Sequence, residues 1–238
     1  MICIHKGSQP PELVAWSVIN RNTTNYCFAG GEFPKGPVKA ALLREQGFLC
    51  AYTMQRIDDE TSHIEHLKPQ CCCQSGEDVD YGNLLACHPG PNTRSEYGAQ
   101  RKADWWPDDI APLEMHFVSP LHPHCEQHFR YDLNGNMLPH REDDNIAAQT
   151  IKILGLQNPV LIGLRRSRVR TALKNHRHEP LSLGEAQRKL AELDSRDADG
   201  RLPPFLAAVR QTLQGHIERM ERKRTAKQLA ARARRRDD

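Results

Sequence analysis

The stretch of sequence that decides the fold is residues 63–69, which reads HIEHLKP. Its acidic residue, Glu65, directly precedes a histidine, His66. The chain over residues 62–67 is expected to be extended, and Pro69 ends it because proline cannot donate a hydrogen bond to a neighbouring strand. A carboxylate and an imidazole are therefore expected at the end of one strand, where a long loop begins.

A second segment, residues 80–87 with the sequence DYGNLLAC, adds an amide to this pair. Cleaving a phosphodiester requires an activated water, charge stabilisation on the phosphate and help for the leaving oxygen, and one divalent ion with one histidine can supply all three. Glu65 is expected to bind a hard ion such as Mg²⁺ or Mn²⁺ through oxygen, while His66 acts as general base. The Asn83 amide can accept one backbone hydrogen bond and donate another, so it suits a strut for the loop beside His66. The pattern predicts a one-metal nuclease site.

The order of these motifs resembles that of the HNH, or ββα-metal, endonucleases over about residues 36–106. The motifs that carry this resemblance are Cys50-Ala51-Tyr52, Ile64-Glu65-His66 with Pro69, and Asp80-Tyr81-x-Asn83-Leu84-Leu85. More narrowly, the chain is similar to the HNH nuclease subunit of Septu and retron anti-phage defence systems, the PtuB-like family. That similarity extends to most of the chain through Lys102-Ala103-Asp104-Trp105, Phe117-Val118-Ser119-Pro120-Leu121, Cys125-Glu126-x-x-Phe129-Arg130-Tyr131-Asp132-Leu133-x-Gly135 and Ala148-x-Thr150-Ile151-x-x-Leu154-Gly155-Leu156.

The resemblance implies an α+β, mostly helical fold, in which a small ββα-metal (HNH) nuclease module is embedded between N- and C-terminal helices. It also implies a divalent-metal-dependent DNase that works with a partner ATPase, with or without a reverse transcriptase and its nucleic-acid product. The third motif position of the superfamily is a His or Asn metal ligand. Here Gln100 is the expected equivalent, with Asn92 as its rival and His88 as the next candidate. Lys102 is expected to contact the phosphate backbone as a point charge.

At 238 residues the chain is long enough for a nuclease module with an N-terminal helix and for a helical extension, which are expected at residues 1–140 and 141–238. The formal charge of +3 is too small to indicate a nucleic-acid partner by itself. No apolar run approaches the roughly 18 residues of a membrane span and no signal peptide is recognised, so a cytoplasmic protein is expected. Its eight cysteines should then stay reduced. Structural zinc is not expected, because Thr53 replaces the second cysteine of the usual pair that Cys50 would begin.

The remaining elements follow from local signals. A helix beginning at Pro37 and ending before Gly47 should lead into a strand over residues 48–52. Residues 68–104 are rich in Gly, Pro, Asn and Cys, which favours a long functional loop with one short helix over regular sheet. Four helices are expected after residue 142. Their signals are an aspartate cap at 143 or 144, Asn158 before Pro159, a capping box of Ser182 with Glu185, and an apolar stripe from Phe205 to Met220.

Arginine and lysine crowd the C-terminus, which includes Arg232, Arg234, Arg235 and Arg236. Such a run is either a solvated helix face or a salt-sensitive, sequence-blind contact to DNA or RNA. Both interpretations remain open.

Two alternatives to a DNase also remain open. One is an RNase or tRNA-directed toxin, because no residue is identified that would read a 2′-hydroxyl. The other is a nucleic-acid-binding subunit whose catalytic site has decayed, which would explain Gln100. His63, expected on the strand face opposite Ile64, is set aside as an ordinary strand histidine. No glycine-rich phosphate loop of the Walker type is present, so any ATP dependence must come from another chain.

Overall fold

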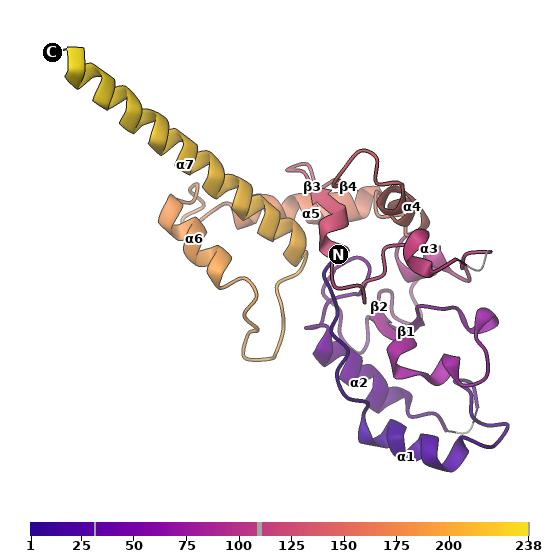
Figure 1. Cartoon of the computed structure of the whole chain (residues 1–238). Coiled ribbons are helices and arrows are strands. Elements are labelled where there is room, and N and C mark those ends of the chain that lie inside the picture. The colour runs from indigo at the N-terminus through magenta and orange to yellow at the C-terminus, as the bar shows by residue number, and fades with distance from the viewer. Residues whose placement is uncertain (31, 109–110, 238) are drawn as a thin grey trace.

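The computed structural model describes residues 1–30, 32–108 and 111–237, without the side chains of residue 231 and residues 233–237. Within these residues the fold is mixed α+β and mostly helical, as expected, with two small antiparallel sheets (Figure 1). The helices are α1 (Pro11–Asn20), α2 (Lys35–Glu45), α3 (Ala99–Lys102), α4 (Asn145–Ile153), α5 (Pro159–Ala172), α6 (Leu183–Ala191) and α7 (Leu206–Asp237). The strands are β1 (His63–His66), β2 (Leu84–Cys87), β3 (Phe129–Tyr131) and β4 (Met137–Pro139).

The turn that follows α2 corrects the strand expected over residues 48–52. Gly47 and Phe48 both have positive φ values, 60° and 57°, which end the helix and turn the chain back. Leu49 forms only an isolated bridge with Arg56. Residues 49–52 are apolar because this turn is buried in the core, and the prediction mistook burial for an extended run.

The β1–β2 hairpin confirms the extended segment expected over residues 62–67. The two strands pair antiparallel, with Glu65 opposite Leu85 and His66 opposite Leu84. The expectation that residues 68–104 contain no regular sheet was wrong, because β2 lies within them. All four residues of β2 are buried, so the strand shows no alternation of apolar and polar side chains that would have revealed it.

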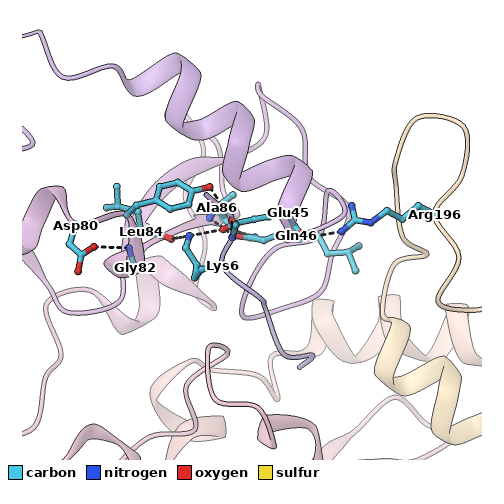
Figure 2. A network of polar contacts seen from close by, with 11 residues as sticks. Lys6, Glu45, Gln46, Asp80, Gly82, Leu84, Ala86 and Arg196 are labelled. Carbon is cyan, nitrogen blue, oxygen red and sulfur yellow. Dashed lines mark hydrogen bonds and ion pairs between the residues drawn. The ribbon is translucent and has the colours of Figure 1, made fainter. Parts of the chain in front are cut away.

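The free edge of β2 is completed by a side chain of the residue after α2. Gln46 is 2% exposed, and its Oε1 accepts a hydrogen bond from the Ala86 N–H at 2.8 Å. Its Nε2 donates to the carbonyls of Ala86 and Leu49, each at 2.8 Å. Figure 2 shows this amide lying beside the strand. Because an unpaired backbone group in a buried strand is costly, Gln46 stabilises the hairpin as a short third strand would.

Glu45 joins the hairpin to the N-terminal segment (Figure 2). Its carboxylate accepts hydrogen bonds from Lys6 Nζ at 2.5 Å and from the Tyr81 hydroxyl at 3.0 Å. Lys6 also donates to the Leu84 carbonyl at 2.9 Å. From the loop after α6, Arg196 donates to the Glu45 carbonyl at 2.9 Å. The N-terminal segment therefore bonds the hairpin directly through Lys6, and the loop after α6 bonds the end of α2.

The C-terminal helices form where their local signals predicted them. Asp144 caps α4 by accepting from the Ala147 N–H at 2.9 Å, and Asn158 caps α5 by accepting from the Val160 N–H at 2.9 Å. The capping box of Ser182 and Glu185 begins α6. The first turns of α7 are buried, whereas its residues from 221 to 230 are exposed, and Figure 1 shows the helix running out from the body to the C-terminus. Among the described residues, no helix combines the length and apolar composition needed to cross a membrane.

Candidate active site

A polar cleft lies where the end of β1 meets α3. It has a volume of about 390 Å³ and is lined by His63, Glu65 and His66 of β1, by Gln70, and by Gln100 and Asp104 of α3 and the chain after it. The structure therefore brings together Glu65, His66 and Gln100 among the residues singled out from the sequence. Asn92 is exposed and is not among the described residues that line the cleft.

Glu65 lies between two basic side chains. Its Oε1 is 3.3 Å from Lys102 Nζ, and its Oε2 is 3.6 Å from His63 Nε2. Oε1 is buried and accepts no hydrogen bond from the described residues. Instead, the Lys102 ammonium donates to the His66 carbonyl at 3.1 Å. A carboxylate that is not saturated by hydrogen bonds has a lone pair left for a further cation, so the site fits a divalent ion.

Lys102 lies inside the protein, where its side chain is 2% exposed. The sequence suggested a contact between Lys102 and a phosphate, and that contact stays a prediction. In the structure the ammonium group balances the charge of Glu65 and ties α3 to β1.

The tautomer of His66 is set by the backbone. Its Nε2 lies 2.9 Å from the Asp78 carbonyl oxygen, which can only accept, so Nε2 carries the proton and the neutral ring keeps its lone pair on Nδ1. The Phe28 ring meets the imidazole edge to face, with 4.6 Å between centroids. Burial lowers the pKa of His66 below its ordinary value, although the Asp78 carbonyl favours the charged ring. The imidazole is therefore neutral at pH 7 and able to accept a proton.

The Asn83 amide connects the end of β1 with the loop that holds His66. Its Oδ1 accepts from the Lys68 N–H at 2.7 Å, and its Nδ2 donates to the carbonyls of Lys68 at 3.1 Å and Glu77 at 3.2 Å. Glu77 precedes Asp78, whose carbonyl orients the imidazole. Asn83 thus acts on His66 through two backbone segments and does not touch the ring.

The amide of Gln100 is bonded to the preceding loop. Its Oε1 accepts from the Ser95 N–H at 2.6 Å, and its Nε2 donates to the Thr93 carbonyl at 3.0 Å. Both polar atoms are therefore occupied in this conformation. His88, the further candidate, stacks on the Tyr97 ring with 5.9 Å between centroids.

His63 is a cleft residue that sequence reasoning set aside. Its side chain lies on the Glu65 side of β1, because residues two apart on a strand share a face. Burial disfavours its charged form, but Glu65 and the Pro89 carbonyl outweigh burial and raise the pKa of His63. The signal that could have found it is the spacing of two between His63 and Glu65.

The basic tail is placed only in part. Arg232 is exposed on α7, whereas the side chains of Arg234, Arg235 and Arg236 lie outside the described residues.

Within the described part of the chain, no group of three or more His, Cys, Asp and Glu side chains is arranged to hold a metal ion by itself. An ion in the cleft would therefore complete its coordination with water or phosphate oxygens, as Mg²⁺ commonly does.

A carboxylate and a histidine whose tautomer is set by a carbonyl line one polar cleft, and an amide strut holds the loop beside them. Hydrolytic enzymes use sites of this kind. No family model matches the chain. The chain is a distant homologue of a protein from Vibrio cholerae serotype O1 biovar El Tor that is named "Retron Vc95 putative HNH endonuclease", with 26% identity over 198 residues. The alignment covers 75% of this chain and 90% of that relative.

Proposed function

We propose that this protein is a divalent-metal-dependent HNH endonuclease that hydrolyses phosphodiester bonds of DNA in anti-phage defence. The observation that carries the proposal concerns the neutral His66 ring. It donates its Nε2–H to the Asp78 carbonyl and lines one cleft with Glu65. The name of the distant relative supports both the endonuclease class and an association with a retron.

In this proposal His66 is the general base. Its Nδ1 accepts a proton from a water molecule, the water oxygen bonds to phosphorus, and the bond from phosphorus to the 3′ oxygen breaks. The leaving 3′ oxygen takes a proton from a second water molecule, and the proton held by His66 restores that water. The products are a 5′-phosphate and a 3′-hydroxyl. The Asp78 carbonyl stabilises the imidazolium that forms, because it already accepts the Nε2 proton. Asn83 is a positioning residue that keeps this carbonyl in place.

Glu65 is the proposed ligand of Mg²⁺ or Mn²⁺, which when bound stabilises charge that develops on the phosphate. Lys102 pairs with Oε1, which leaves Oε2 as the oxygen available to an ion. Gln100 and Asn92 remain proposals for a further ligand. Gln100 would have to release Ser95 and Thr93 to bind an ion.

We propose two domains: a nuclease module over residues 1–140 and a helical extension over residues 141–238. We propose that a partner ATPase controls the nuclease, with a reverse transcriptase and its nucleic-acid product where the system is a retron. Arg232, Arg234, Arg235 and Arg236 are proposed to hold nucleic acid through its phosphates, without reading sequence.

The test is a cleavage assay with the purified protein, alone and with its partner ATPase, on DNA and RNA of matched sequence. Cleavage of DNA in Mg²⁺ or Mn²⁺, abolished by a chelator and leaving 5′-phosphate ends, is the expected result. Cleavage of RNA alone would replace the proposal with a ribonuclease. Binding without turnover under every condition would identify a subunit with a decayed site.

A further inference from the structure

His63 has one ring nitrogen committed to the backbone. Its Nδ1 lies 2.6 Å from the Pro89 carbonyl oxygen, and because a carbonyl can only accept, Nδ1 carries a proton. In the neutral ring the lone pair is then on Nε2, the atom that lies 3.6 Å from Glu65 Oε2. Histidines that bind metal ions almost always donate their other ring N–H to a carboxylate, a backbone carbonyl or water.

A second histidine in the chain shows what an ordinary histidine–carboxylate pair looks like. His128 Nδ1 lies 2.7 Å from Asp144 Oδ2, within hydrogen-bond distance. The two pairs are similarly exposed, with side-chain values of 28% and 13% for His63 and Glu65 and of 32% and 15% for His128 and Asp144. At 3.6 Å, His63 and Glu65 are too far apart for a hydrogen bond between them.

The separation of the two atoms suits two ligands of one ion. Atoms that each lie about 2.1 Å from an ion are about 3.0 Å apart at a right angle and about 3.4 Å apart at the tetrahedral angle. The observed 3.6 Å needs only a small rotation of the carboxylate. Lys102 lies beside Oε1, the other oxygen, so Oε2 can serve an ion while the ammonium stays in place.

We propose that His63 Nε2 and Glu65 Oε2 together bind the catalytic ion, and that the site therefore favours Mn²⁺ and related transition ions over Mg²⁺. This inference rests on the proposed metal-dependent function and names the second protein ligand and the class of ion. Imidazole suits transition ions, whereas Mg²⁺ prefers oxygen ligands alone. Water and phosphate oxygens complete the coordination.

The experiment is calorimetric titration of the full chain with Mn²⁺ and, separately, with Mg²⁺. We expect His63→Ala to weaken Mn²⁺ binding at least tenfold. His63→Gln keeps an oxygen at this position, so we expect it to lower the ratio of Mn²⁺ to Mg²⁺ affinity while retaining Mg²⁺ binding. His128→Ala is the matched control and should leave both affinities unchanged. Circular dichroism verifies that each variant is folded.

A direct readout is the imidazole ¹⁵N spectrum during titration with the diamagnetic ion Zn²⁺. We expect the His63 Nε2 resonance to shift, while the His128 resonances stay in place. Mn²⁺ affinity that changes less than twofold in His63→Ala, with a loss in Glu65→Ala, would overturn the inference and leave the proposed function intact. A parent protein that binds neither Mn²⁺ nor Mg²⁺ would overturn both.

Discussion

The β1–β2 hairpin and the outer half of α7 hold their charged side chains in opposite ways. Glu65 of β1 faces the buried Lys102 of α3 at 3.3 Å, and the Lys102 ammonium also donates to the His66 carbonyl. On α7, Arg222 and Glu218 pair at 3.6 Å with side-chain exposures of 82% and 63%. Charges on an exposed helix are screened and act through their summed field, whereas charges in a cleft act on particular atoms. In the proposed function, the hairpin therefore serves the chemistry and the tail attracts nucleic acid.

The largest effect that would test this comparison is expected at His66. His66→Ala should reduce cleavage about 100- to 10,000-fold, because a general base contributes that much to the rate. Single-turnover cleavage rates measure the loss. His176→Ala changes an exposed histidine between α5 and α6 and should leave the rate unchanged. A His66→Ala protein that cuts at more than a tenth of the parent rate would remove His66 as the base.

Lys102→Met tests whether the two ion pairs differ in strength. Removing a partner from a buried pair leaves an uncompensated charge, here Glu65, so the free energy of unfolding should fall by about 3–5 kcal/mol. Arg222→Met in the exposed pair should change it by less than about 0.5 kcal/mol. Urea denaturation of both variants measures the two values. Equal losses of unfolding free energy would show that the Glu65–Lys102 pair contributes no more to stability than the exposed pair on α7.

Asn83→Ala tests how far the hairpin depends on its amide strut. The substitution removes the bonds to Lys68 and Glu77, so we expect a loss of about 1–3 kcal/mol in unfolding free energy. Cleavage should also slow, because the Asp78 carbonyl is then free to move. Thermal melts and rates measured well below the melting temperature separate the two effects. Unchanged cleavage in a destabilised protein would restrict Asn83 to a structural role.

A smaller effect is expected at Gln100 and Asn92, the two alternatives for a further ligand. Because both polar atoms of Gln100 bond the loop, Gln100→Ala should cost about 1 kcal/mol in stability and leave Mn²⁺ affinity nearly unchanged. Asn92→Ala is the comparison, since Asn92 is exposed outside the cleft. Calorimetric Mn²⁺ titration decides the matter: a tenfold loss of affinity in either variant would identify that residue as a ligand.

The smallest effect on chemistry is expected from removing the tail. Deleting residues 225–238 should weaken nucleic-acid binding and flatten its dependence on salt, because arginines that neutralise phosphates release counterions. The rate at saturating substrate should not change. The slope of log affinity against log salt measures the effect. If truncation left that slope unaltered, the tail would be better explained as a helix that docks on the partner protein.

Sequence reasoning succeeded where the signal is local. The extended segment around Glu65 and His66, the caps at Asp144, Asn158 and Ser182, and the apolar start of α7 depend on neighbours a few residues away. It failed where a segment is buried on all sides, because such a segment shows no alternation of apolar and polar residues. β2 was missed because all its residues are buried, and residues 48–52 were taken for a strand because a buried turn is equally apolar.

The sequence by itself determined which chemical groups are available: a Glu-His pair, an asparagine 17 residues beyond His66, and a basic C-terminus. Only the tertiary structure decided how those groups face one another. The Asp78 carbonyl sets the tautomer of His66, the Pro89 carbonyl sets that of His63, and Lys102 points inward to Glu65. The reason is that tautomer and charge balance depend on contacts within a few ångströms, and the chain brings these partners together only by folding.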